Sequence, residues 1–365
     1  MVRKQSYPAM LWGFVKSLKL AVILIISIIV AVTVDIIILA SKWDPSPSSF
    51  ASRAGEIYSH TWFLVLVFLL LINLTACTIN GAVRKIRARH TGIGRWGSTV
   101  FHAGLIVILL GTLATGNYRT FATIKLIQGE PKQVPYNALV TKSLTYEPGG
   151  TMLRFALQSQ QIQLDSSGQV KNIDSWIDLS DGTSGFTGRK LADFEKFFYQ
   201  GLYLFPNKYG YAVGVKVNGP QGKTVADLTV PMETNEFDDG LKSFSKSNYK
   251  IKGLPYDFSF DFYPDIKSHT GGFYGNYSAP LGEPGIYVQA MLNGTAVGRQ
   301  IIRPGDTMKI QDYSLVFEKV KPWTQLYSVY DPGASIVFWG IIVSLIGLTL
   351  FALLSGRKMT ADDFK

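Results

Sequence analysis

Long runs of apolar residues stand near both ends of the chain, and a polar, differently patterned stretch separates them. A helix that crosses a membrane needs about 20 mostly apolar residues. Four segments meet this requirement: Leu20–Ala40, Trp62–Val83, Gly97–Gly116 and Ser335–Ser355. The pattern therefore predicts four membrane-spanning helices, three in the N-terminal part and one near the C-terminus.

Residues 117–333 contain no such run. Short segments there mix or alternate apolar and polar residues, and Gly, Pro, Asn and Asp separate them. The clearest are Thr120–Ile127, Leu153–Leu157, Tyr211–Val217, Ile286–Leu292 and Tyr313–Val320. Short strands with such turns are typical of sandwich-like sheets. Residues 233–250 are polar, and we expect them to form a loop.

The fold class is therefore an α+β membrane protein in three parts. Residues 1–116 hold the N-terminus and the first three helices. Residues 117–333 form a large, mainly β domain between the third and fourth helices. Residues 334–365 hold the fourth helix and a tail.

The basic residues gather beside the predicted helices. They precede the first helix, fill the loop between the second and third, and follow the fourth: Arg3, Lys4, Lys16, Lys19, Arg84, Lys85, Arg87, Arg89, Arg95, Arg357 and Lys358. By the positive-inside rule, both termini and this loop are cytoplasmic, and the β domain lies on the outer side. The net charge of +10 then reflects topology and contacts with membrane lipids rather than nucleic acid.

His102 lies within the third predicted helix, where an ionisable side chain is costly and usually has a function. Gly97, Gly104 and Gly111 recur every seven residues and predict a smooth seam for a neighbouring helix. His102 lies nearly opposite this seam. It shares its face with Thr99, Ile106, Leu109 and Leu113. We expect this face to meet a second membrane protein or a ligand.

Few other residues of the sequence are candidates for a binding or catalytic site. His60 stands beside Trp62 at the opposite membrane interface, roughly 20 Å from the level of His102 in a core of about 30 Å, so the two cannot bind one iron. An interfacial anchor is the favoured interpretation of His60. Cys77 is the single cysteine, which excludes a disulfide within the chain and a Cys-x-x-Cys redox motif. Zinc-hydrolase, phosphate-loop and Gly-x-Ser-x-Gly motifs are missing, so we assign no catalytic residue.

Four groups of residues, in order along the whole chain, carry a resemblance to a known family. They are Leu11–Val22; Ser59-His-Thr-Trp-Phe63 with Leu71–Ile79; Phe101–Gly111 with Gln128-Gly-Glu130; and Asp331-Pro-Gly333 with Trp339-Gly340. Together they resemble the ResB (CcsB) family of cytochrome c biogenesis proteins, from system II. Many members have Trp-Trp where this chain has Thr61-Trp62.

The resemblance implies a function in cytochrome c maturation. ResB-type proteins act with a ResC (CcsA)-type membrane protein as a haem transporter and holocytochrome c synthase, a haem lyase. Haem b crosses the bacterial cytoplasmic (inner) membrane and is attached to Cys-x-x-Cys-His of apocytochrome c, with a thioredoxin-like ResA/CcsX protein as a further partner. His102 matches the family's haem-iron ligand by position, and His60 and Trp62 are secondary candidates.

A different class of function stays open at this point. The chain has no Trp-rich haem-handling segment, so most of the chemistry is expected in the partner. In the alternative interpretation the chain is a non-catalytic membrane scaffold of an envelope complex. His102 then contributes to helix packing, and no haem is bound. The presence of haem in the purified complex with the partner would indicate the haem-lyase function, and its absence the scaffold function.

Overall fold

The computed structural model describes residues 13–41, 60–88, 93–144, 150–164, 170–192, 195–236, 242–269, 272–276 and 281–355. The chain divides into two compact units. One consists of Met1–Phe121, Val140–Glu147 and Val329–Lys365, and the other of Ala122–Leu139 and Pro148–Ser328. Several basic residues that predict the orientation of the chain, such as Arg3, Lys4 and Arg357, lie outside the described residues.

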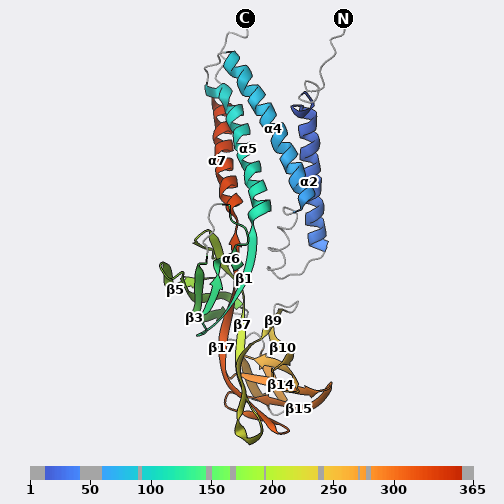
Figure 1. Ribbon diagram of the computed structural model, residues 1–365, viewed down its shortest axis with the longest axis vertical. Coiled ribbons are helices and arrows are strands. Elements are labelled where there is room, and N and C mark those ends of the chain that lie inside the picture. The colour runs from blue at the N-terminus through green and yellow to red at the C-terminus, as the bar shows by residue number, and fades with distance from the viewer. Residues whose placement is uncertain are drawn as a thin grey trace. The chain divides into compact units, whose positions relative to one another are not determined.

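All four predicted spans are helices in the first unit (Figure 1). They are α2 (Leu18–Ser41), α4 (Thr61–Arg87), α5 (Ile93–Tyr118) and α7 (Pro332–Ser355). Each is long and apolar enough to cross a membrane. Large apolar side chains are exposed along them, as expected for helices that face lipid. The chain is therefore an α+β protein with four helices suited to a membrane and a β-rich part between α5 and α7 in chain order.

Polar residues of α4 bind the start of α2. Ser17 caps α2, because its hydroxyl accepts a hydrogen bond from the Leu20 amide at 3.1 Å. The side-chain amide of Asn73, which is 1% exposed, donates to the carbonyl oxygens of Val15 at 2.6 Å and Ser17 at 3.2 Å. The Cys77 thiol donates to the Lys16 carbonyl at 3.3 Å. The neighbouring helix thus supplies donors to backbone oxygens just before α2, and the Ser17 oxygen also accepts the Ala21 amide at 3.3 Å.

The other end of α4 packs through apolar side chains. Phe63 and Val67 form a buried pair. Residues of two other helices pack against this pair: Ile28, Ala31 and Val32 from α2, and Leu109 and Leu113 from α5. Since Asn73 contacts the beginning of α2 and Phe63 its middle, α2 and α4 are antiparallel.

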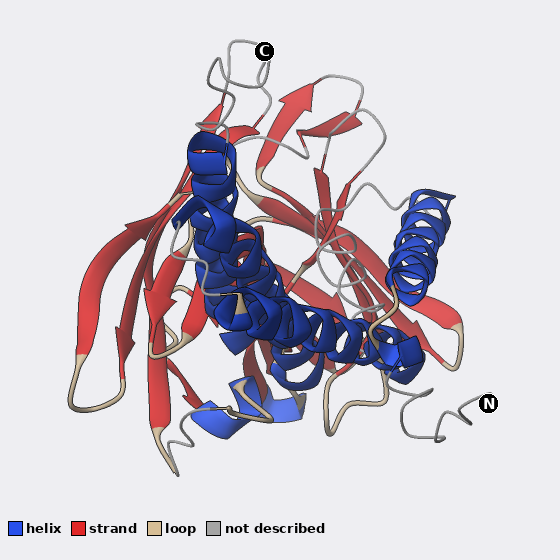
Figure 2. Cartoon of the chain, turned by 90° about the horizontal axis from the view of Figure 1, so that it is seen from above, coloured by secondary structure: helices blue, strands red, loops and turns tan. Residues whose placement is uncertain are grey.

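The second unit is β-rich, and strands (red) make up most of the described chain outside the long helices (blue) in Figure 2. Its short helical elements in the described residues are α6 (Tyr136–Leu139) and η2 (Pro220–Gly222). A six-stranded sheet has the order β1-β17-β7-β6, with β16 beside β17 and β8 beside β7. Its strands are β1 (Thr120–Ile127), β6 (Phe197–Tyr199), β7 (Leu202–Asn218), β8 (Thr224–Pro231), β16 (Thr307–Ile310) and β17 (Tyr313–Tyr330). The predicted segments 120–127, 211–217 and 313–320 all lie in this sheet.

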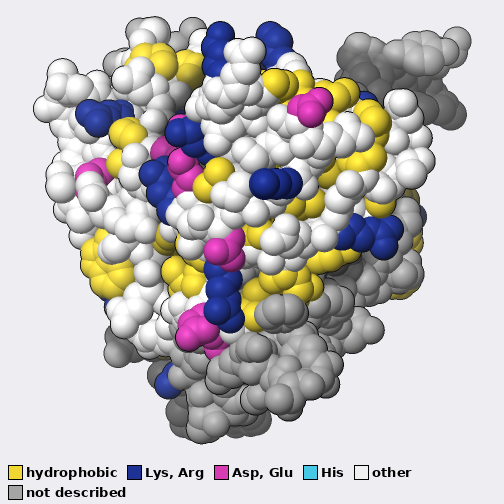
Figure 3. Space-filling view, turned by 90° about the horizontal axis from the view of Figure 1, so that it is seen from below, with side chains coloured by type: hydrophobic (Ala, Val, Ile, Leu, Met, Phe, Trp, Pro, Cys, Tyr) yellow, Lys and Arg dark blue, Asp and Glu magenta, His cyan; other side chains and the backbone are white. Residues whose placement is uncertain are grey.

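A five-stranded sheet has the order β15-β14-β11-β10-β9. Its strands are β9 (Glu233–Glu236), β10 (Lys242–Lys250), β11 (Asp257–Tyr263), β14 (Gly285–Leu292) and β15 (Thr295–Ile302). Valines of β7 and phenylalanines of β11 join one buried cluster, so the two sheets pack face to face. Basic and acidic side chains are interspersed with hydrophobic ones on the face in Figure 3, without one dominant sign.

The expectation of a loop at residues 233–250 is wrong. Residues 233–236 and 242–250 are the paired strands β9 and β10. Phe244 is buried and pairs with Phe262 of β11, while the polar neighbours of Phe244 point to the other side of the sheet. A strand with one buried aromatic needs few apolar residues once a neighbouring strand supplies the pairing.

A separate four-stranded sheet has the order β2-β3-β4-β5. Its strands are β2 (Lys132–Pro135), β3 (Met152–Leu164), β4 (Val170–Ser180) and β5 (Gly185–Leu191). Every second residue of β3 from Leu153 to Leu157 is buried, and the intervening ones face outward. A two-stranded ribbon, β12 (Asp265–His269) and β13 (Gly272–Asn276), completes the described strands.

Candidate functional site

The face of α5 that carries the glycine repeat packs against α7. A Cβ atom added to Gly111 would lie 2.7 Å from Val337 Cγ2 and 2.8 Å from the Val337 amide nitrogen. One added to Gly104 would lie 2.8 Å from the Gly340 carbonyl oxygen, and closer still to Ser344. The predicted seam is therefore real, and it is filled by the backbone of a helix more than 200 residues away in the sequence.

α7 presents a matching set of glycines to α5. A Cβ on Gly340 would lie 2.8 Å from the Ile108 amide nitrogen, and one on Gly347 would lie 2.7 Å from Phe101 Cα. Small residues at this spacing on both helices let the two backbones approach closely, which is how helices associate in lipid. The contacts run in opposite order along the two helices, so α5 and α7 are antiparallel.

A polar cluster closes one end of this helix pair. Asp331 precedes α7 and accepts hydrogen bonds from the Ala334 amide at 3.2 Å and the Thr115 hydroxyl at 2.8 Å. The Arg119 Nε lies 3.8 Å from the other Asp331 oxygen, and the Arg119 guanidinium stacks 4.3 Å from the Phe121 ring centre. The sequence signal for this cluster is an Asp-Pro pair at a helix start. In the sequence this pair is part of the family resemblance, but it predicts no contact with Thr115 or Arg119.

The opposite face of α5, which carries His102, is not bare. Near one end, Lys85 of α4 donates a hydrogen bond to the Thr99 hydroxyl at 2.7 Å. Near the other end, Leu109 and Leu113 pack against α4. The sequence predicted that this face meets a second membrane protein or a ligand. The structure instead shows that part of the face contacts α4 of the same chain. These contacts arise because α4 and α5 are consecutive helices, and elements that follow one another in the chain usually lie side by side.

His102 lies between those two contacts. Its side chain is half-buried, and its ring contacts Phe101 with ring centres 5.6 Å apart. Among the described residues, no hydrogen bond or ion pair engages the His102 imidazole. Both ring nitrogens are thus open to a ligand that reaches this part of the helix.

His60 and Trp62 lie together at the beginning of α4. His60 is the N-cap residue and makes no side-chain capping hydrogen bond. Its ring stacks on that of Trp62, with centres 6.3 Å apart and an interplanar angle of 16°. Both side chains are exposed. They form a small aromatic surface at a helix end, as expected of an interfacial anchor.

The structure does not bring His60 and His102 together. His60 is three residues before Phe63, and Phe63 belongs to the same buried contact as Leu109 and Leu113. Leu109 is already about 10 Å along α5 from His102, at 1.5 Å per residue. A metal ion bound by His102 could therefore not be bound by His60 as well. The described residues contain no cluster of three or more His, Cys, Asp or Glu side chains suited to a metal.

Comparison with known proteins adds little. No family model matches the sequence, and no curated protein matches it. A solved structure titled "Cytochrome c Heme Lyase CcmF" was found with 12% identity and a TM-score of 0.29, covering 89% of this chain and 34% of that one. The chain thus spans about a third of that protein's length. A likeness of this size supports no conclusion on fold or function.

Proposed function

We propose that this protein is the ResB-like half of a haem transporter and cytochrome c synthase. It would work with a ResC/CcsA-type membrane protein, and haem would be its cargo rather than a resident cofactor. One observation carries the proposal: an imidazole with no hydrogen bond or ion pair among the described residues lies within a helix suited to a membrane. The motifs that resemble the ResB family supply the identity of the cargo.

The physical argument begins with the cost of His102. A polar side chain in the hydrocarbon region is unfavourable unless it is paired or has a function. A structural histidine would recover that cost through a hydrogen bond, and His102 makes none to the described residues. Binding iron recovers it instead, because a neutral imidazole nitrogen is a good axial ligand of haem iron. The apolar porphyrin ring also suits a site within lipid.

The second ligand and the rest of the pocket are assigned to the partner. His60 lies at the far end of α4, and the α5 glycine face is already occupied by α7. This leaves the half-buried flank of α5 at His102 as the surface for the partner. By the positive-inside pattern we expect this half of α5 to lie toward the cytoplasm, where haem would be received. The β-rich unit would then be on the outer side, near the apocytochrome.

A structural role is the second candidate, and one observation favours it. The stripe that includes His102 contacts α4 on both sides of it, at Thr99 and at Leu109. In a scaffold subunit this stripe serves only helix packing. The two functions differ in whether haem is bound, so one experiment separates them.

The experiment is co-expression with a ResC/CcsA-type partner, followed by purification and measurement of haem absorbance. The wild type, His102→Gly and His60→Gly are compared. We expect haem with the wild type and with His60→Gly. His102→Gly should have lost or spectrally shifted haem, which added imidazole restores because it replaces the missing ligand. Equal yields of the complex show that the variants fold.

Two results would overturn the proposal. Haem that is identical in all three proteins would show that His102 is not a ligand. Haem that is missing from all three, in a complex of normal yield, would support the scaffold function.

A further inference from the structure

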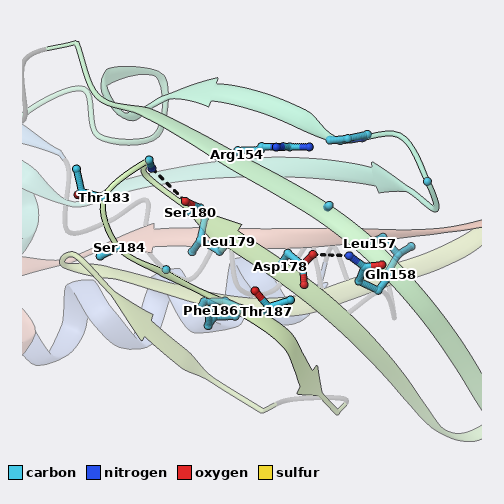
Figure 4. A pocket seen from close by; sticks show the side chains of 15 residues that line it. Arg154, Leu157, Gln158, Asp178, Leu179, Ser180, Thr183, Ser184, Phe186 and Thr187 are labelled. Carbon is cyan, nitrogen blue, oxygen red and sulfur yellow. Dashed lines mark hydrogen bonds between the residues drawn. The ribbon is translucent and has the colours of Figure 1, made fainter.

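A polar hollow of about 690 Å³ lies on the outward face of the four-stranded sheet (Figure 4). Its floor is formed by β3 and β4. One wall is the segment after β1 that contains Gly129 and Pro131, and the other is the turn between β4 and β5 with the first residues of β5. This volume is within the range of small-ligand sites in proteins, about 300–1,000 Å³. All of the lining residues belong to the β-rich unit.

The floor is low because a small residue stands at its centre. Ala156 of β3 pairs with Asp178 of β4, and Arg154 pairs with Ser180. These four side chains share the outward face of the sheet. A larger residue in place of Ala156 would fill the space between its longer neighbours.

The turn that forms one wall is held by its own hydrogen bonds. Asp181 accepts them from the amides of Thr183 at 2.8 Å and Ser184 at 2.6 Å, and from both hydroxyls. These backbone amides hold the pKa of the Asp181 carboxyl well below its usual range. The turn is thus ordered before any ligand arrives, which lowers the entropic cost of binding.

The opposite wall is fixed as well. The Gly129 amide donates to the Leu157 carbonyl at 3.3 Å, and the Gln128 side chain donates to the Gln158 carbonyl at 2.8 Å. Glu130 forms an ion pair with Lys321 and accepts a hydrogen bond from the Thr229 hydroxyl. Both walls are therefore tied to the sheets behind them.

One charged group in this hollow has no partner among the described residues. The exposed Arg154 guanidinium makes no hydrogen bond, ion pair or ring contact with the described residues. Asp178 is different, because it accepts hydrogen bonds from the Gln158 side chain and, at 2.6 Å, from the Gly188 amide. Figure 4 shows Arg154 across the hollow from Phe186 and Thr187, with Asp178 between them.

We propose that this hollow binds a polypeptide segment through an acidic side chain that Arg154 receives. The planar guanidinium matches a carboxylate with two parallel hydrogen bonds. The Asp178 charge disfavours a dianion such as phosphate, and it suits a ligand that also offers N–H donors, as a peptide backbone does. Phe186 also borders the hollow, and its ring packs on that of Phe197 with centres 4.4 Å apart. This inference goes beyond the haem function and does not depend on it.

The test is a selection of random nonapeptides on the full chain in detergent. Wild type, Arg154→Gln, Ala156→Phe and Arg299→Gln are used as separate baits. Arg299 is the matched control, because it is an exposed arginine on a strand of the same unit, distant in sequence, and has no ion pair among the described residues. Far-UV circular dichroism and thermal unfolding show that each bait is folded.

We expect peptides with Asp or Glu at one fixed position to be enriched by the wild type and by Arg299→Gln. The enrichment should be lost with Arg154→Gln and reduced with Ala156→Phe. Replacing that acid by its amide in the best peptide should weaken binding about tenfold or more, because a charge-assisted pair is lost. A wild type that enriches nothing, acidic enrichment that persists in Arg154→Gln, or enrichment of basic peptides through Asp178 would each overturn the proposal.

Discussion

The contact between α5 and α7 allows a prediction whose magnitude follows from the structure. Substituting Gly104 by Ala adds one methyl group where no space exists. That carbon would lie 2.8 Å from the Gly340 carbonyl oxygen and nearer still to the Ser344 amide. Non-bonded atoms prefer about 3.5–4.0 Å, so the two backbones must separate by about 1 Å at this point.

The separation weakens many small contacts at once. A gap of about 1 Å forfeits roughly half of the dispersion energy at each atom pair that it opens. Over-packing by one methyl group typically costs about 1–3 kcal/mol. Alanine regains up to about 1 kcal/mol as a better helix former than glycine. We therefore expect Gly104→Ala to lower the free energy of unfolding by about 1–2 kcal/mol.

Gly81 of α4 provides the matched control. It is also a helical glycine, and a Cβ atom there would meet nothing within 4 Å. Gly81→Ala should therefore be neutral or more stable than the wild type, by up to about 1 kcal/mol. The two variants make the same chemical change, and only one of them makes it inside a helix contact.

The assay is unfolding of the full chain in mixed micelles by increasing SDS, followed by far-UV circular dichroism, in which helices dominate. The SDS concentration at the transition midpoint should be lowest for Gly104→Ala, higher for the wild type, and equal to or higher than the wild type for Gly81→Ala. Gly104→Val should be lower than all of them, because it adds two further methyl groups. Equal midpoints for Gly104→Ala and Gly81→Ala would refute the close packing of α5 against α7.

Two further predictions concern polar contacts. Asn73→Leu should lower the free energy of unfolding by about 1–3 kcal/mol in the same SDS assay, because the Val15 carbonyl oxygen loses its side-chain donor and the Ser17 oxygen keeps only the Ala21 amide; an unchanged midpoint would contradict the importance of these bonds. Glu130→Gln should change the pH dependence of thermal unfolding. Burial raises the pKa of the Glu130 carboxyl, but hydrogen bonds and the charge of Lys321 outweigh it and hold the pKa below the ordinary value. Since the folded-state pKa is depressed, this carboxylate stabilises the fold above its unfolded-state pKa, and the stabilisation is lost as pH falls through the folded-state pKa. On acidification the melting temperature of Glu130→Gln should therefore fall less than that of the wild type. Identical curves of melting temperature against pH would contradict a stabilising role of the Glu130 carboxylate.

Local patterns along the sequence were enough to find the helices and several strands. Membrane spans follow from length and composition, so the four helices lie within a few residues of their predicted limits. The glycine repeat of α5 likewise indicated a close helix contact before any partner was known, because small residues let two helix backbones approach closely. The segment at Thr120–Ile127 was predicted with the bounds that the structure has.

Only the tertiary structure decided which surfaces meet. The glycine face of α5 at Gly104 packs against α7, and the face with His102 contacts α4. A helical wheel cannot show these contacts, because it represents one helix at a time. The strands at 233–250 were missed because their stability comes from pairing with distant β11 rather than from their own residues. Arg154 is an ordinary surface arginine in the sequence. It becomes a candidate binding residue only when the sheet places Ala156 and Asp178 beside it and a folded turn closes the hollow. Periodicity is a local property that the sequence records, whereas the partner of each face depends on contacts between segments far apart in the chain.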